Sequence, residues 1–152
     1  MQQIIFFVIF LNVFLFGCEK NIGLTVENDP TRPVFHRQEA FKKILNSFEP
    51  LGLMHRKEKV FNLKEYQKHA QHLKETQNEP WPYFKENTFY PPSRSKENII
   101  TENNIFLNEI AEYKNAVNLL NDTAQTGDAM AMQRAYDTLH GTCRSCHKQF
   151  RK

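Results

Sequence analysis

Two cysteines and a histidine stand close together near the end of the chain, in the run C-R-S-C-H at Cys143, Cys146 and His147. Each thiol of this pattern can add to one vinyl group of a haem, and the imidazole of the next residue can reach the iron. On a helix, positions i, i+3 and i+4 lie on one face. We therefore expect a single covalently attached haem c, with His147 as the ligand of its iron.

Three other interpretations of these residues compete with haem attachment. A redox C-x-x-C usually lies where a strand meets a helix, whereas the pattern around this one is helical. A zinc site needs a fourth ligand of suitable geometry, and the sequence has no second C-x-x-C and no H-x-x-x-H. A structural disulfide would leave His147 without a role. Haem attachment is the interpretation that gives all three residues a function.

The N-terminal segment indicates export. Residues 4–16 are apolar apart from Asn12, a run shorter than the ~20 residues of a spanning helix and typical of a signal peptide. No Lys or Arg precedes the run, and an uncleaved anchor is the alternative. The ending L-F-G-C resembles a bacterial lipobox, which predicts a signal peptide of lipoprotein type at 1–17 and a lipid on Cys18. We expect a periplasmic protein that meets a membrane only through this anchor.

Composition narrows the class of protein further. The 152 residues suit one domain with a short appendage. The net charge of +3 comes from scattered basic residues, which argues against a nucleic-acid partner. If Cys18 is lipidated or removed by ordinary cleavage nearby, no cysteine is left for a structural disulfide.

Hydrophobic periodicity predicts four helices after a polar tether at residues 18–33. The first begins near Pro33, and Pro50 and Gly52 should kink or end it. The second runs from about Asn62 to Asn78, after which residues 79–97 form a long loop rich in proline and aromatic residues. The expected inner faces are Phe41, Ile44, Leu45, Phe48 and Leu51 in the first helix, and Leu63, Tyr66, Ala70 and Leu73 in the second.

The last two helices have the clearest pattern. Gly127 should end the third, and Asp128 should cap the fourth, which begins at Ala129 and runs to the C-terminus. Their inner faces are Phe106, Ile110, Tyr113, Val117, Leu120 and Ala124, then Met132, Ala135, Leu139, Cys143, Cys146 and Phe150. We predict an all-α fold for residues 34–152, an antiparallel up-down-up-down four-helix bundle with covalently bound haem.

The C-terminal run C-R-S-C-H-K-Q-F-R-K resembles the cytochrome c′ family, whose pattern C-x-x-C-H-x-x-(Y/F)-R lies in the last helix. Upstream, H-R-Q-E-A-F is similar to the family's first-helix pattern Y-R-Q-x-x-(L/M/F), and P-W-P-Y-F resembles its proline-tryptophan loop. The resemblance covers roughly residues 34–152. It implies a haem-carrying helical bundle that often pairs as a homodimer through its first two helices.

The same resemblance implies roles for four further residues. Arg37 and Gln38 match the family's first-helix pair, with Arg37 near a haem propionate. Phe41 takes the distal position above the iron, where Leu or Met is commoner. Arg151 lies beside the proximal face, near His147.

These roles favour a binding protein rather than an enzyme. Phenylalanine has no lone pair, so Phe41 would leave the iron five-coordinate and open to small neutral gases, nitric oxide and carbon monoxide, with some capacity for electron transfer to an unidentified redox partner. The alternative is a six-coordinate electron-transfer cytochrome of the respiratory chain, with Met54 as the rival sixth ligand. A peroxidase or nitrite reductase would need a distal His–Arg arrangement that we do not find.

Other histidines and methionines have simpler interpretations. His69 and His72 stand three residues apart, as metal ligands can, but a solvated helix face is the expected explanation. His140 could approach a haem edge, although a surface histidine is the simpler expectation. Met130 and Met132 are expected to be packing residues.

Overall fold

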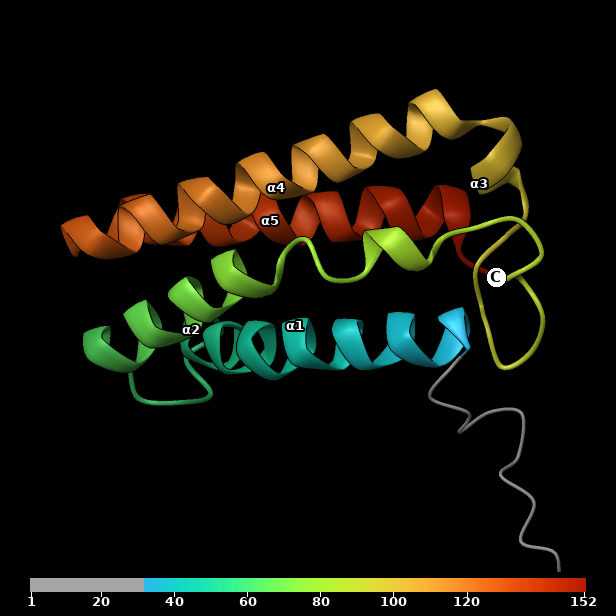
Figure 1. Ribbon diagram of the computed structural model, residues 1–152. Coiled ribbons are helices and arrows are strands. Elements are labelled where there is room, and N and C mark those ends of the chain that lie inside the picture. The colour runs from blue at the N-terminus through green and yellow to red at the C-terminus, as the bar shows by residue number, and fades with distance from the viewer. Residues whose placement is uncertain (1–31) are drawn as a thin grey trace, which may run out of the picture.

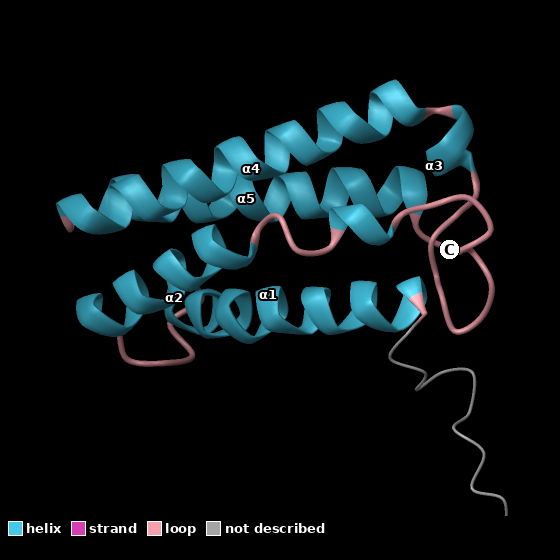
Figure 2. Cartoon of the chain, in the orientation of Figure 1, coloured by secondary structure: helices cyan, strands magenta, loops and turns pink. Residues whose placement is uncertain are grey.

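The structure is a computed structural model that describes residues 32–152. These residues form helices and loops without a strand, apart from one isolated bridge between Ser95 and Arg151 (Figure 2). The predicted signal peptide at 1–17, the lipidation site Cys18 and almost all of the tether at 18–33 lie outside the described residues. None of the helices in residues 32–152 has the length and apolar character needed to cross a membrane.

Four long helices lie side by side and alternate in direction along the chain (Figure 1). They are α1 (Pro33–His55), α2 (Leu63–Thr76), α4 (Asn103–Thr126) and α5 (Ala129–Phe150). α1 packs on α2, α2 on α4 and α4 on α5, whereas α1 and α5 meet over a much smaller area. The predicted all-α, up-down-up-down bundle is confirmed, with one side of the bundle less tightly closed than the other three.

The helix boundaries follow the capping signals in the sequence. Asn62 begins α2, and its Oδ1 accepts a hydrogen bond from the backbone N–H of Glu65 at 3.0 Å. Gly127 ends α4 with a φ of 71°, a left-handed conformation that glycine adopts without steric cost. Asp128 then caps α5 by accepting hydrogen bonds from two backbone amides of its first turn. The short turn between α4 and α5 fixes where α5 starts and thus which of its residues face inward.

Most predicted inner residues are buried, including the whole predicted stripe of α4. Two lie at the surface, and for these the prediction was wrong: Leu63 is 38% exposed and Met130 67%. Leu45 is 56% exposed, but it lines the cavity described below. Leu63 and Met130 lie in the first turns of their helices, beyond the last layer of the core.

The sequence predicted that Pro50 and Gly52 would either kink or end the first helix. Helix α1 does not end there but continues to His55. The turn after the proline is buried, and Gly52 lets Tyr136 of α5 approach the α1 backbone. A Cβ at this position would lie 2.6 Å from Tyr136 Oη. Contact with α5 stabilises this last turn, although Pro50 cannot donate its own helical hydrogen bond.

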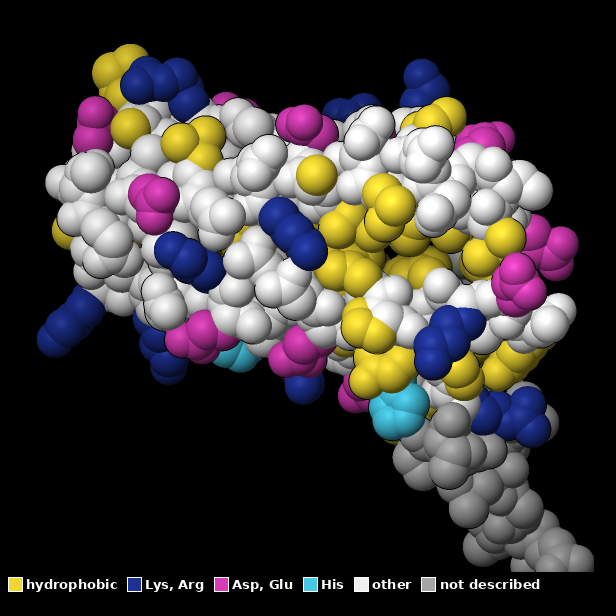
Figure 3. Space-filling view, turned by 45° about the horizontal axis from the view of Figure 1, so that its top comes forward, with side chains coloured by type: hydrophobic (Ala, Val, Ile, Leu, Met, Phe, Trp, Pro, Cys, Tyr) yellow, Lys and Arg dark blue, Asp and Glu magenta, His cyan; other side chains and the backbone are white. Residues whose placement is uncertain are grey.

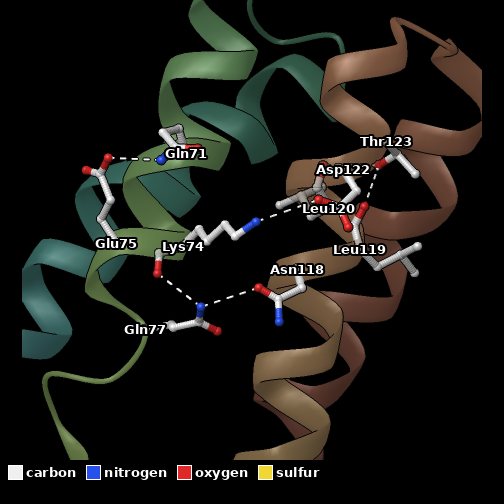
Figure 4. Close-up of polar contacts among 9 residues, drawn as sticks. All are labelled: Gln71, Lys74, Glu75, Gln77, Asn118, Leu119, Leu120, Asp122 and Thr123. Atoms are coloured by element: carbon white, nitrogen blue, oxygen red, sulfur yellow. Dashed lines mark hydrogen bonds and ion pairs between the residues drawn. The ribbon is translucent and has the colours of Figure 1, made fainter.

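The outer seam between α2 and α4 is polar (Figure 4). Gln77 Nε2 donates to Asn118 Oδ1 at 3.4 Å, and Lys74 Nζ lies 3.7 Å from an Asp122 carboxylate oxygen. The exposed ion pair between Lys74 and Asp122 contributes little free energy. The seam therefore helps to align the two helices, while burial of the apolar stripes beneath it stabilises the bundle.

One end of the bundle carries the long loop, the start of α1 and the C-terminus (Figure 1). The loop includes the short helices η2 (Trp81–Tyr83) and α3 (Asn98–Thr101). Its later part is joined to the chain end, since the backbone N–H of Lys96 donates to the carbonyl of Phe150 at 2.9 Å. The loop thus forms a wall across this end of the bundle.

The close approach at Gly52 can be tested by substitution. We expect Gly52→Ala to lower the free energy of unfolding, because overpacking costs about 1–3 kcal/mol and exceeds the helix-propensity gain of about 1 kcal/mol. Gly141→Ala on α5 is the matched control, since a Cβ there meets nothing within 4 Å and the variant should be more stable. Denaturant unfolding measures both, and equal stabilisation would contradict the close contact.

Candidate functional site

A cavity of about 740 Å³ lies at the loop end of the bundle, between α1, α4, α5 and the loop. Figure 3 shows one face of this end hollowed among hydrophobic side chains. Pockets that hold cofactors are mostly apolar and have volumes of about 300–1,000 Å³. The apolar wall of this cavity includes Ile44, Phe48, Leu73, Phe84, Ile99, Phe106, Ile110 and Leu139.

Helix α5 presents Cys143, Cys146 and His147 to this cavity, as their spacing predicts. Both cysteines are half-buried free thiols. Burial raises the pKa of the Cys143 thiol to about 11 and that of the Cys146 thiol to about 11. The two thiols are therefore protonated at neutral pH. Within residues 32–152 no cluster of three or more metal-ligating side chains occurs.

His147 lies at the rim of the cavity and is held in its neutral form. Partial burial lowers the pKa of the imidazole, and the positive charges of Arg151 and Arg94 lower it further. A neutral imidazole keeps a lone pair that it can donate to a metal. Burial and the two neighbouring cations thus favour the neutral form of His147, which can act as a ligand.

These residues fit a haem c. The cavity is apolar, and one helix face supplies two thiols for its vinyl groups and one neutral imidazole for its iron. Cys143 and Cys146 would hold the group covalently, and His147 would ligate it. When bound, the haem supplies an iron that accepts an electron or a small ligand.

Phe41 and Gln38 line the cavity from α1, whereas His147 lines it from α5. The ring of Phe41 packs edge-on against Trp81, with centroids 5.7 Å apart. Trp81 is fixed in turn, because its indole N–H donates to the carbonyl of Gln77 at 2.6 Å. The α1 wall therefore presents a phenyl ring held in place by its neighbours.

Tyr113 also lines the cavity, which its position in a packing stripe did not reveal. The residue is only 8% exposed, and its hydroxyl has no hydrogen-bond partner in residues 32–152. Burial and the nearby Cys143 raise the pKa of this hydroxyl. A buried hydroxyl without a partner costs about 1–3 kcal/mol. Tyr113 is thus a neutral donor at the cavity that the protein itself leaves unpaired.

Arg37 lies at the cavity, but its guanidinium also organises the loop. It donates to the carbonyl of Tyr83 at 3.0 Å, to the carbonyl of Thr88 at 2.9 Å and to Ser93 Oγ at 2.8 Å. It also stacks over the ring of Phe84 at 4.5 Å. Arg37 is only 3% exposed, and burial lowers the pKa of its guanidinium. No carboxylate is among these partners, so the charge remains available to an anionic group of a bound haem.

Arg151 lines the cavity rim and is exposed, one residue beyond the end of α5. His140 lies on the same rim. Met54, the rival sixth ligand, is 4% exposed in the core between the helices and does not line the cavity. The structure therefore brings together all seven predicted haem-site residues, and leaves Met54 apart from them.

The remaining histidines and methionines belong to other surroundings. His72 Nδ1 lies 2.7 Å from Ser47 Oγ, and His69 pairs with Glu65. Met132 is a core residue, as expected, whereas Met130 is exposed. None of the four lines the haem cavity.

Comparisons with known proteins agree with this geometry. A family model described as Cytochrome C′ matches residues 32–151. No curated protein sequence matches the chain.

Solved structures similar to this one share its bundle. Cytochrome c prime from Shewanella frigidimarina has a TM-score of 0.77 at 19% identity, over 79% of this chain and 94% of its own. Cytochrome c′ from Rubrivivax gelatinosus has a TM-score of 0.75 at 22% identity, over 80% and 98%. The nitric oxide complex of a variant of cytochrome c prime from Alcaligenes xylosoxidans has a TM-score of 0.73 at 19% identity, over 80% and 97%.

Replacing Arg37 tests its hold on the loop. We expect Arg37→Met to lower the free energy of unfolding by about 2–4 kcal/mol, because several buried acceptors lose a charged donor at once. Lys64→Met, at an exposed lysine of α2, is the control and should change little. Limited proteolysis should cut residues 83–93 faster in Arg37→Met only. Equal cleavage of both variants would show that Arg37 does not fasten the loop.

Proposed function

Because this chain belongs to the cytochrome c′ family and so carries a covalently bound haem c, we propose that its iron is five-coordinate and binds small neutral gases such as nitric oxide and carbon monoxide. Cys143 and Cys146 hold the haem, and His147 ligates its iron. Phe41 covers the opposite face. The protein retains a capacity for electron transfer, and it acts by binding rather than by catalysis.

The observation that carries this proposal is the composition of the α1 wall. Phe41 stands there, and a phenyl ring cannot ligate iron. Among the described residues that line the cavity there is no methionine, and both lining histidines, His140 and His147, lie on α5. A side chain on the helix that bears the proximal ligand is poorly placed to ligate the opposite face.

The cavity also selects among ligands by polarity. The wall around Phe41 is mainly aliphatic and aromatic, and such surroundings suit a ligand that loses little hydration on entry. A neutral diatomic gas has little hydration to lose. Variants of the similar Alcaligenes xylosoxidans protein have been solved with nitric oxide and with carbon monoxide bound, which supports the same ligand class here.

The alternative, a six-coordinate electron carrier ligated by Met54, gains no support from the structure. Met54 lies in the core among residues of α1, α2 and α5, and bringing it to the iron would require unwinding the buried end of α1. Catalysis of the peroxidase type lacks a histidine on the α1 wall of the cavity.

The proposed location rests on the sequence of residues 1–18, which lie outside the described part. A signal peptide would carry the chain to the periplasm, where a lipid on Cys18 would hold it to a membrane.

The visible spectrum of the ferrous protein tests the coordination number directly. We expect a broad, unsplit high-spin band, because Phe41 stands on the α1 wall and neither a methionine nor a histidine of α1 lines the cavity. The protein should be produced in a host that matures c-type cytochromes. Sharp, split low-spin bands would contradict the proposal and would favour electron transfer as the main function.

Gating by Phe41 makes a kinetic prediction. In Phe41→Ala we expect carbon monoxide to bind at least about tenfold faster, which corresponds to removing about 1.4 kcal/mol from the entry barrier. Phe61→Ala, at a 49% exposed ring in the loop between α1 and α2, is the control and should bind at the wild-type rate. Flash photolysis measures both, and an unchanged rate in Phe41→Ala would remove this residue from the gate.

A further inference from the structure

Six cationic side chains gather where the end of α5 meets residues 94–96. This basic corner consists of Arg94, Lys96, Arg144, Lys148, Arg151 and Lys152. Arg94, Arg144 and Arg151 line the rim of the haem cavity, and all of the six except Lys96 are exposed. The positive charge is therefore concentrated beside the opening through which a bound haem would be closest to solvent.

The backbone holds the two segments of the basic corner together. The N–H of Lys96 donates to the carbonyl of Phe150 at 2.9 Å, and the N–H of Lys152 donates to the carbonyl of Arg94 at 2.7 Å. The ammonium group of Lys96 also donates to the carbonyl of Gln149 at 3.0 Å. Like charges are thus kept close by the fold, against their mutual repulsion.

Helix α5 alone does not account for this arrangement. Cations near a helix C-terminus interact favourably with its dipole, which gives Lys148, Arg151 and Lys152 a local role. The effect falls off within the last turn and does not reach Arg144. Nor does it explain why the loop brings Arg94 to the same place.

The cations of the basic corner also differ from those elsewhere in their partners. Lys43, Lys59 and Lys74 each pair with a carboxylate. In residues 32–152 none of the six corner cations pairs with an Asp or Glu side chain, although Arg94 Nη2 donates to Lys152 O at 3.2 Å. The nearby Glu109 is instead bound by Ser145 Oγ and Gln149 Nε2.

A bound haem would not neutralise the basic corner. Its two carboxylates can compensate two charges, and the buried Arg37 is already available to one of them. Six exposed or half-exposed cations outnumber what remains, so the rim keeps a positive potential. Such a potential attracts a negatively charged partner and raises its rate of association at low salt.

We infer that the basic corner is the docking surface for an electron-transfer protein with an acidic surface patch, an inference that rests on the haem and electron-transfer capacity proposed above. In the exchange the reduced partner loses one electron and the ferric protein gains it, with no bond made or broken. The corner places the acidic patch over the rim of the haem cavity, where the path between the two redox centres is short.

Charge reversal with a matched control tests this docking. The reaction is reduction of the ferric holoprotein by a reduced acidic two-iron ferredoxin, followed by stopped flow. Lys148→Glu with Lys152→Glu alters the basic corner without touching the cavity lining, and Lys64→Glu with Lys68→Glu makes the same change of net charge on α2. We expect the corner variant to react about tenfold more slowly at low ionic strength, and the control at nearly the wild-type rate.

Salt provides the second readout. Between about 0.01 M and about 0.3 M ionic strength the Debye length falls from about 30 Å to below 10 Å, so the difference between the variants should vanish. Equal slowing in both variants, or a rate independent of salt, would overturn the inference. So would binding of phosphatidylglycerol vesicles through the corner without any effect on the ferredoxin reaction, which would assign the surface to lipid. The carbon monoxide on-rate and ferrous spectrum of each variant report the gas-binding proposal separately.

Discussion

The haem site depends on how α5 is rotated about its own axis, because two thiols and one imidazole on this helix must face the same flat group. That rotation is set at the opposite end of the helix, where Gly127 ends α4 and Asp128 begins α5. From this fixed start, Leu139 reaches the floor of the cavity and Cys143 and His147 reach its side. A shift by one residue would turn the attachment motif toward α4 or solvent, so the tight turn and the haem site are parts of one geometric requirement.

The other walls of the cavity meet a second requirement. They surround an apolar group without leaving buried polar side chains short of hydrogen-bond partners. Arg37 shows how this is done, since a buried charge is acceptable when its donors are satisfied. The loop supplies those acceptors and is shaped by them in return. Tyr113 is the exception, because its hydroxyl is buried at the cavity without a partner. The gas-binding proposal uses the same wall, in which Phe41 rather than a ligating side chain stands on α1.

Much of this arrangement could be predicted from the sequence because local signals determine it. The stripe of α4, the caps at Asn62 and Asp128, and the attachment motif all act over a few residues. Leu63 and Met130 were misplaced because periodicity alone does not fix where a buried stripe ends. The continuation of α1 past Pro50 depends on contact with Tyr136, which no local pattern reveals. The partners of Arg37 and the unpaired hydroxyl of Tyr113 likewise arise from contacts between distant segments, and only the fold brings them together.

The way the loop is fastened has a consequence for the order of assembly. It is held in its middle by Arg37 and at its end by backbone hydrogen bonds between Lys96 and Phe150 and between Lys152 and Arg94, and its helix η2 packs on α1. Phe89 and Ile99 of this segment also join Phe106, Ile110 and Phe150 in one apolar cluster, so undoing the loop would uncover that cluster as well as the cavity. Packing at this end of the bundle and enclosure of a large, rigid prosthetic group are therefore parts of the same step.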